Sequence, residues 1–397
     1  MGMHSALAVT TENLDMAKAA RDLAQQVERQ LPAVQNRCGV LFTEGDGDWD
    51  ELLAALQAEL PMPLAGCTGT ALISSRGYHT LSTTLLVFGG DDCSFGAAMT
   101  RPLGDDPEAA VREAFALAKA ALGDDPLEAV FVFSAGSPAL SEDDKLTVLD
   151  GLAEGKPVFG AIAADYFTLD QSMVFCGDKA ASEAVTILAV GGNVRPRFVV
   201  RNLPTSTGTG AKVTESDGYT VRRVGDKTPF AIMSGHGIDT STPMGLFYAP
   251  LCLELENEDD YDGVPICGTF RSVDADTGSG WSLTRIPEGA RLTVQPIQNT
   301  DIAATAREAL ALMCETIAAE ERDSDYVYST ILGVTCAARL VVLAGEQSLE
   351  GDLARDMLPE RLRFAAFYSY GEFCPTSIRD GRAKNRLNNL TIGLCAM

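Results

Sequence analysis

The sequence has few basic residues, few histidines and no long apolar segment. Its 31 Lys and Arg stand against 55 Asp and Glu, which gives a net charge of −24 over 397 residues, without a basic cluster. Nucleic-acid binding needs a basic face that neutralises phosphates, and anionic membrane surfaces attract basic segments. The deficit of basic residues therefore argues against nucleic acid and membrane surfaces as partners.

Signals for membrane insertion or export are also missing. No apolar run approaches the roughly 18 to 20 residues that a membrane-spanning helix needs. The N-terminal segment MGMHSALAVTTENLD does not combine a basic region with a following apolar region, as a signal peptide does. We therefore expect a cytoplasmic protein without membrane insertion.

Residues that commonly carry catalysis or bind metals are sparse. The ten cysteines stand singly, so their spacing predicts neither a zinc site nor a disulfide framework. We expect His4 in a frayed terminus and His79 and His236 in surface loops. Ser134 does not belong to a nucleophile elbow, because Val132 stands where the first glycine is needed. No metal, no other cofactor and no enzyme activity are predicted.

What the sequence does contain is a repeated order of helices and strands. Apolar stripes predict helices over 14–31, 48–60, 107–122 and 141–154, with apolar strands between them. Corresponding positions in the two copies, such as Gly66 and Gly160, are shifted by nearly the same number of residues as the helix starts, which indicates an internal duplication.

A third, looser copy closes the chain. It begins with a helix over 301–321 and continues with strands in YSTILGVTC and RLVVLAG, a helix near 349–358, and strands in RFAAFYSYGEFCP and NLTIGLCA. The segment before it is rich in strands and includes a hairpin that turns at Asp-Thr-Gly-Ser-Gly. This order predicts an α/β (α+β) fold of mixed β-sheets covered by helices, with internally repeated units and a domain boundary that separates 1–196 from 197–397.

Small and polar residues follow the strands at equivalent places in the copies. They occur in GCTGT, GAIAADYF and YSYGEF, and the candidates for a binding site are Cys67, Thr68, Asp165, Tyr166, Tyr370, Gly371 and Glu372. Small residues let a ligand approach a strand closely, and an acid just beyond them can receive an ammonium group. The alternative is that the small residues allow tight packing of helix on sheet and the acids cap loops.

These segments resemble the FIST family of sensory proteins, which pair an N-terminal with a C-terminal FIST domain. PLAGCTGTALIS and PVFGAIAADYF are similar to signatures of the N-terminal domain, and FRSVDADTGSGWSLTRIPEGARLTV, FYSYGEFCP and RLNNLTIGL to those of the C-terminal domain. The resemblance implies a FIST N-like domain over 1–196 and a FIST C-like domain over 197–397. It also implies a cytoplasmic sensor of amino acids or similar small metabolites that signals through a separate output partner, such as a kinase or cyclase.

Four hypotheses follow. The first is ligand binding without chemistry, in which Glu372 or Asp165 receives a ligand amine and a backbone donor or Arg271 receives a carboxylate. The second is a haem-based gas sensor, because some FIST relatives are described as binding haem, with His79, His236 or a cysteine as axial ligand. The third is an enzyme with Cys67 as nucleophile, although no cationic neighbour in the sequence would lower the pKa of this thiol. The fourth is a ligand-independent interaction scaffold.

Overall fold

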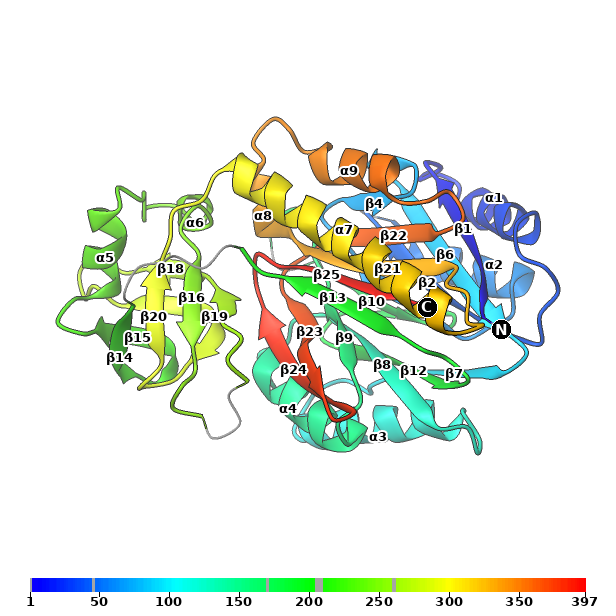
Figure 1. Cartoon of the computed structure of the whole chain (residues 1–397), viewed down its shortest axis with the longest axis horizontal. Coiled ribbons are helices and arrows are strands. Elements are labelled where there is room, and N and C mark those ends of the chain that lie inside the picture. The colour runs from blue at the N-terminus through cyan, green and yellow to red at the C-terminus, as the bar shows by residue number, and fades with distance from the viewer. Residues whose placement is uncertain (1, 45–46, 169–170, 204–209, 259–261) are drawn as a thin grey trace.

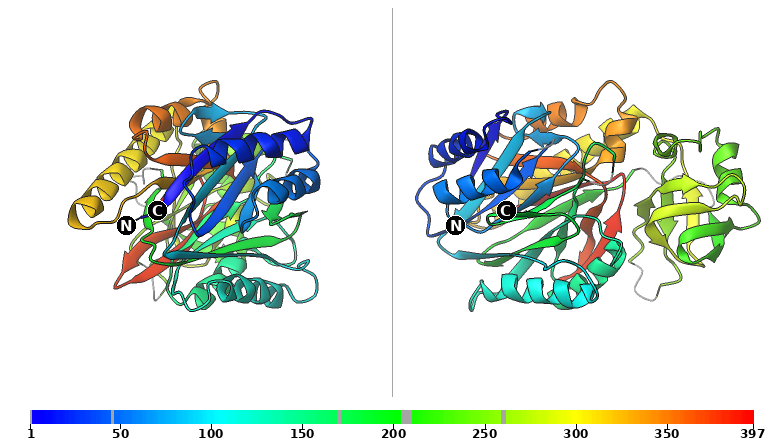
Figure 2. Two further views of the ribbon diagram at one scale, coloured as in Figure 1. Left: turned by 90° about the vertical axis from the view of Figure 1, so that its right-hand side faces the viewer. Right: turned by 180° about the vertical axis from the view of Figure 1, so that it is seen from behind.

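The computed structural model describes residues 2–44, 47–168, 171–203, 210–258 and 262–397. Three units with a similar order of elements form a large body, and a smaller domain lies at one end of this body (Figure 1). Seen from behind, the smaller domain projects from the body, which also holds both chain termini (Figure 2). None of the helices in the described ranges is long and apolar enough to cross a membrane.

Each unit of the body runs strand, helix, strand, helix, strand, hairpin and strand. The first unit consists of β1 (His4–Thr10), α1 (Met16–Glu28), β2 (Asn36–Thr43), α2 (Trp49–Glu59), β3 (Leu64–Thr68), β4 (Leu72–Ser74), β5 (Gly77–His79) and β6 (Thr83–Gly90). The second consists of β7 (Cys93–Met99), α3 (Pro107–Ala120), β8 (Leu127–Ser134), α4 (Glu142–Ala153), β9 (Val158–Ile162), β10 (Val174–Cys176), β11 (Lys179–Ala181) and β12 (Val185–Gly192).

The third unit is interrupted by the smaller domain, which follows its first strand, and it has one additional short helix. It consists of β13 (Arg197–Arg201), α7 (Asn299–Asp323), β21 (Thr330–Cys336), α8 (Ala337–Val342), α9 (Leu349–Met357), β22 (Arg363–Ser369), β23 (Glu372–Arg379), β24 (Arg382–Asn388) and β25 (Ile392–Ala396).

Polar side chains fix the starts of the helices in the first two units. Asp15, Asp48, Asp106 and Ser141 each accept a hydrogen bond from a backbone N–H in the first turn of α1, α2, α3 and α4. Such a cap satisfies one of the N–H groups that have no partner within the helix. The caps explain why these helices begin within a few residues of the positions expected from the sequence.

Each unit completes its sheet with a hairpin from another unit. The sheet orders are β1-β6-β2-β3-β10-β11, β24-β23-β9-β8-β12-β7 and β13-β25-β21-β22-β4-β5. The first sheet thus takes its hairpin from the second unit, the second from the third unit, and the third from the first unit. This exchange forms a closed cycle, so the three units are interlocked.

The repeated glycines stand where two strands approach most closely. A Cβ atom on Gly66 would lie 1.9 Å from the carbonyl oxygen of Leu41, and one on Gly160 would lie 1.9 Å from that of Val132. Only glycine avoids this clash. The duplication seen in the sequence therefore marks the same close contact between parallel strands in two sheets.

The three sheets enclose one central core to which every unit contributes. Phe42, Phe133 and Phe367 come from the first, second and third unit and are fully buried. Their ring centroids lie 5.8 Å apart for Phe42 and Phe133, 4.4 Å for Phe42 and Phe367, and 6.3 Å for Phe133 and Phe367. Such aromatic contacts add to the free energy gained from apolar burial.

The smaller domain, which we call the inserted domain (residues 210–297), has a sheet of its own. Its elements are β14 (Ala211–Ser216), β15 (Gly218–Val224), α5 (Pro229–Gly235), α6 (Pro243–Leu246), β16 (Leu251–Glu254), β17 (Ile266–Gly268), β18 (Phe270–Val273), β19 (Gly280–Ile286) and β20 (Arg291–Val294). The expected hairpin is confirmed: β18 pairs with β19, and the Gly278 N–H donates to the Asp274 carbonyl at the turn.

The α/β fold class of mixed sheets with internally repeated units is confirmed, and three local expectations are wrong. His79 does not lie in a surface loop, because it is a partly buried residue of β5, which pairs with β4. His4 does not lie in a frayed terminus, because it begins β1, which pairs antiparallel with β6. RLVVLAG does not form a strand, because Ala337–Val342 is the helix α8. The predicted boundary after residue 196 lies directly before β13 and stays a prediction.

Buried polar contacts explain why an apolar segment becomes α8. The Arg339 guanidinium is fully buried and forms an ion pair with Glu350 at 2.7 Å. It also donates to Thr305 Oγ1 at 3.1 Å and to the carbonyl oxygens of Ile302 and Leu390. The helix places Arg339 where α7, α9 and the segment before β25 supply these acceptors, and hydropathy alone does not reveal such a site.

Candidate functional site

The ends of β3, β9 and β22 meet at the centre of the body. Three backbone hydrogen bonds of 2.9–3.1 Å connect them in a cycle, from Thr70 to Tyr368, from Ala164 to Thr68 and from Tyr370 to Ile162. Seven of the eight sequence-predicted site residues lie at the ends of these strands or shortly after them, and Arg271 lies on β18 of the inserted domain.

Cys67 and Thr68 face the interior of the body. Cys67 is fully buried in the central core, and burial raises the pKa of its thiol well above the usual range. The Thr68 hydroxyl accepts a hydrogen bond from the Met173 N–H at 3.0 Å. These contacts are structural, and a buried thiol of raised pKa is a poor nucleophile.

Asp165 organises the loop that follows β9. Its carboxylate accepts hydrogen bonds from the N–H and the hydroxyl of Thr168, from the Gln171 N–H and from the Tyr370 hydroxyl. The Tyr370 hydroxyl in turn accepts from the Phe167 N–H at 2.7 Å. Asp165 and Tyr370, which are far apart in sequence, therefore lie in direct contact, and Asp165 acts as a loop cap.

Tyr166 lies on the other side of this loop. Its side chain is 46% exposed, and its hydroxyl donates to Glu44 at 3.3 Å. Burial raises the pKa of Glu44 to about 7, against the opposing effect of the hydrogen bond from the Leu81 N–H. Sequence reasoning did not find Glu44, because it lies in the first unit, far from Tyr166 in sequence.

Glu372 lies deeper than the other acids. It is fully buried, it accepts a hydrogen bond from the Ser369 hydroxyl at 2.7 Å, and its Oε2 has no partner among the described residues. Burial raises its pKa to about 8. Gly371 lies beside it, with its carbonyl accepting from the Ile162 N–H, and a Cβ atom there would lie 3.1 Å from Asn389 Nδ2.

A cavity of about 310 Å³ lies between the body and the inserted domain, next to these residues. The inserted domain contributes Pro243, Met244, Phe247, Thr269, Arg271 and Leu283. The body contributes Phe167, Cys336, Ala337, Ala338, Ser369, Tyr370 and Asn389. The cavity is thus lined by two parts of the chain that fold on separate sheets.

Of the eight predicted site residues, Arg271 and Tyr370 line this cavity. Glu372 lies directly behind its wall, in contact with the lining residue Ser369. Asp165 and Gly371 also lie behind the wall, in contact with or next to Tyr370, whereas Cys67, Thr68 and Tyr166 do not line it. The residues contributed by α6 carry no signal in the sequence, because only the fold places them opposite the third unit.

Two polar groups in the lining have unused hydrogen-bonding capacity. Arg271 lies on β18 and is only partly buried. Its side chain makes no hydrogen bond or ion pair with any other described residue. Asn389 is 1% exposed, and within the described chain its Oδ1 has no partner, while its Nδ2 donates to the Tyr370 carbonyl. Most of the remaining lining is apolar, which is typical of small-molecule sites.

The histidines lie elsewhere. His79 Nε2 lies 2.7 Å from Ser74 Oγ, and burial followed by the charge of Arg76 lowers the pKa of this imidazole. His236 is an exposed residue after α5. Neither lines the cavity, and no group of three or more His, Cys, Asp or Glu in the described ranges is arranged to hold a metal ion.

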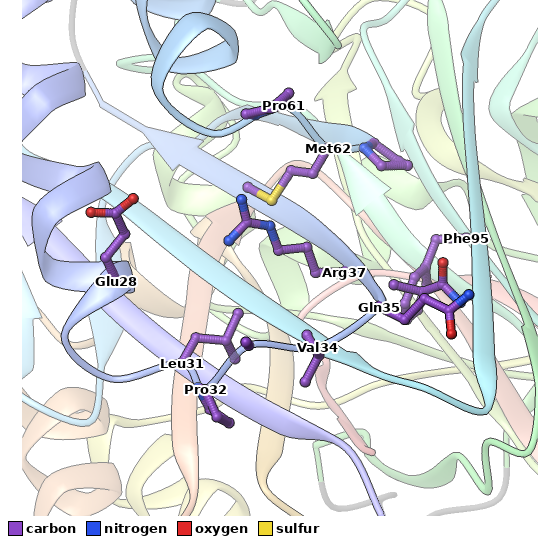
Figure 3. Close-up of a pocket in the computed structure, with 12 residues that line it drawn as sticks. Glu28, Leu31, Pro32, Val34, Gln35, Arg37, Pro61, Met62 and Phe95 are labelled. Atoms are coloured by element: carbon purple, nitrogen blue, oxygen red, sulfur yellow. The ribbon is translucent and has the colours of Figure 1, made fainter.

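A second and more open pocket of about 640 Å³ lies at the far side of the body. Figure 3 shows the Arg37 side chain extending from β2 toward the Met62 side chain, with Glu28 of α1 and Pro32 at its other margin. Its remaining lining comes mostly from the loops after α1 and α2. None of the sequence-predicted residues lies there, so we place the candidate site in the cavity beside Tyr370.

Residues 37–227 match the FIST N domain, and residues 236–375 match the FIST C domain. No curated protein matches the chain as a relative. A structure of cyanuric acid hydrolase, described as an evolutionary innovation by structural concatenation, is 13% identical over 67% of this chain and 85% of that one, with a TM-score of 0.27. T. maritima PurL complexed with ATP is 10% identical over 99% and 71%, with a TM-score of 0.21. Likenesses this weak carry no argument.

The two domain matches cover most of the chain and include the strands that surround the cavity. FIST domains are sensory domains, so the two matches define a sensory class of protein. The chain is a member of the FIST family.

Proposed function

We propose that this protein is a sensor that binds a small carboxylate metabolite in the cavity between the body and the inserted domain. The observation that supports this most is that Arg271 and Asn389, both with unused hydrogen-bonding capacity within the described chain, lie in an otherwise mostly apolar cavity. An arginine fork matches a carboxylate in geometry and charge. Amino acids, the class implied by the family resemblance, are the first ligands to test.

The position of the cavity between the two parts supports a mechanism in which ligand binding changes their relative position. A ligand that contacts Arg271 of the inserted domain and Tyr370 of the body favours the relative position of the two parts in which both contacts form. A separate cytoplasmic output protein, such as a kinase or cyclase, would read that position.

Thermal unfolding in the presence of amino acids and small carboxylates tests the proposal. A ligand at a hundred times its Kd stabilises the folded state by about 2.7 kcal/mol. Leu283→Trp places a large ring in the cavity, and we expect it to weaken binding at least tenfold. Ile378→Trp is the matched control, because Ile378 is 50% exposed and does not line the cavity.

Three outcomes would contradict the proposal. The first is that no compound in the set shifts the unfolding temperature of the native protein. The second is that Leu283→Trp, with an unchanged unfolding temperature of its own, binds the ligand as well as Ile378→Trp does. The third is a Soret shift on haem addition that His79→Ala or His236→Ala abolishes, which would support the haem-sensor hypothesis.

A further inference from the structure

The described lining of the cavity contains a cation but no carboxylate. Arg271 lines it, and no Asp or Glu is among the described residues that do so. Arg271 also has no anionic partner within the described ranges, so its charge is not neutralised by the protein. The cavity therefore has a place for an anion.

The acids nearest to the cavity are not available to a cationic group. The Asp165 carboxylate is occupied by Thr168, Gln171 and Tyr370. Glu372 is fully buried behind Ser369, which separates it from the cavity. An ammonium group in this cavity would lose its hydration without gaining a carboxylate, and burial of an uncompensated charge is costly.

The other polar side chains of the lining are neutral. Thr269, Ser369, Tyr370 and Asn389 can form hydrogen bonds, but they do not compensate a full positive charge. The rest of the inserted domain's side is mainly apolar and includes Met244, Phe247 and Leu283. These side chains suit a hydrocarbon chain or an aromatic ring.

The size of the cavity limits the ligand. A volume of about 310 Å³ lies at the lower end of the range of about 300–1,000 Å³ that is typical of small-molecule sites. A dinucleotide or a peptide of several residues is larger than this. A single carboxylate attached to a short apolar body fits.

We propose that the cavity selects a small monocarboxylate with an apolar body and without an ammonium group, and that Arg271 holds its carboxylate. The inference rests on the proposed function and narrows it, because it predicts that an apolar α-amino acid binds less tightly than the corresponding acid that lacks the amine. A hydroxyl in place of the amine is tolerated, because it carries no charge that the lining would have to compensate.

Three compounds with one skeleton test this directly. 3-Phenylpropionate, 3-phenyllactate and phenylalanine differ only in carrying hydrogen, hydroxyl or ammonium next to the carboxylate, and hexanoate and norleucine repeat the comparison with an aliphatic body. By calorimetry on the full chain, we expect each amine-bearing compound to bind at least tenfold more weakly than its amine-free counterpart. 2-Phenylethylamine, which has no carboxylate, should not bind.

Variants at Arg271 identify the contact. Arg271→Met removes the charge but keeps an unbranched side chain, and we expect at least tenfold weaker binding of the carboxylates, because the variant lacks the guanidinium that holds them. Arg271→Lys should retain part of the affinity. Arg223→Met is the matched control, because Arg223 is exposed on the same domain and lies outside the cavity.

The outcomes separate this inference from the proposed function. Phenylalanine or norleucine binding as tightly as its amine-free counterpart, with Leu283→Trp still weakening it, overturns the selectivity and leaves the sensor proposal intact. Unchanged carboxylate binding in Arg271→Met overturns the role of Arg271. Failure of all these carboxylates to bind overturns the inference, whereas failure of every small metabolite overturns the proposed function as well.

Discussion

The contacts inside the body differ in kind from the contacts between the body and the inserted domain. Inside the body, three sheets exchange hairpins and share one aromatic core. The inserted domain contacts α4 through polar side chains: Tyr219 donates to Asp143 at 3.0 Å, and Arg285 pairs with Asp144 at 2.9 Å. A small apolar cluster adds to these polar contacts, in which Cys267 of the inserted domain packs with Cys336 and Leu343 of the body. The difference teaches that the candidate cavity lies where two separately folded parts meet, and not inside the interlocked core.

One ion pair inside the body and one ion pair between the body and the inserted domain differ in burial. Arg339 and Glu350 of the body form an ion pair with side chains 0% and 1% exposed. Arg285 of the inserted domain and its partner Asp144 are 51% and 40% exposed. Removal of one partner of a buried pair leaves an uncompensated charge, whereas an exposed pair contributes little to stability. Substitutions can therefore test whether the two regions differ as described.

The largest effect is expected from Arg339→Ala. It leaves Glu350 buried without its cation and should lower the free energy of unfolding by about 3–5 kcal/mol. The matched variant Arg291→Ala removes an exposed arginine of the inserted domain and should cost less than about 1 kcal/mol. Urea unfolding measures both, and equal losses would contradict the distinction between the two regions.

The next effect concerns pH and the body. Burial raises the pKa of Glu372 from 4.5 to about 8, so the folded state binds this proton more tightly than the unfolded chain does. The resulting stabilisation is fully present below pH 4.5 and is lost as the pH rises through about 8. Glu372→Gln keeps a neutral group, and we expect it to exceed the native protein in stability by about 2 kcal/mol at pH values near 9.

The control for this prediction comes from the inserted domain. Glu256→Gln is the matched variant, because it makes the same change at a side chain that is 62% exposed and alters no buried carboxyl group. Unfolding curves recorded between about pH 5 and pH 9 provide the comparison. An identical pH dependence in Glu372→Gln and the native protein would mean that this carboxyl is not the source.

The smallest effect is expected at the contact between the two regions. Tyr219→Phe removes the hydroxyl that donates to Asp143 and should cost about 1 kcal/mol. Because the contact lies between the domains, amide hydrogen exchange should become faster in residues 211–294 and stay the same in the central strands of the body. Tyr248→Phe offers a comparison at another contact between the two parts, because the Tyr248 hydroxyl donates to the Val341 carbonyl of α8. Faster exchange in β2 and β8 after Tyr219→Phe would show that the two parts unfold together.

Local signals made much of the body predictable. Asp48 and Ser141 cap the helices that the apolar stripes indicate, and Gly66 and Gly160 mark equivalent close contacts in two sheets. Arg339 shows where local reading fails, because its helical position depends on acceptors from three other segments. Sequence patterns describe the secondary structure that a segment prefers by itself. For the segment around Arg339, hydrogen-bond acceptors far away in the sequence determine that it is a helix.

The candidate site was predictable mostly on the side of the body, and Arg271 is the predicted residue on the side of the inserted domain. Tyr370 and Glu372 follow a strand of the third unit, and the repeated small-residue pattern indicates them. Phe247 and Met244 come from the inserted domain, whose position opposite Tyr370 depends on tertiary contacts. The exchanged hairpins also place predicted residues beside strands of another unit. Glu372 pairs with Ala161 of the second unit, just as Val174 of the second unit pairs with Cys67 of the first. No local pattern identifies pairing partners this far apart.

The cyclic exchange of hairpins also sets an order for synthesis. The sheet of the second unit needs β23 and β24, so a growing chain cannot complete it until residue 388 has left the ribosome. The sheet of the first unit is likewise incomplete until β10 and β11 of the second unit have been synthesised. The sheet of the third unit receives β4 and β5, which are synthesised before it. A fragment cut between units would leave unpaired strand edges, which favour aggregation. Shorter versions of this sensor should therefore keep all three units or fail to fold.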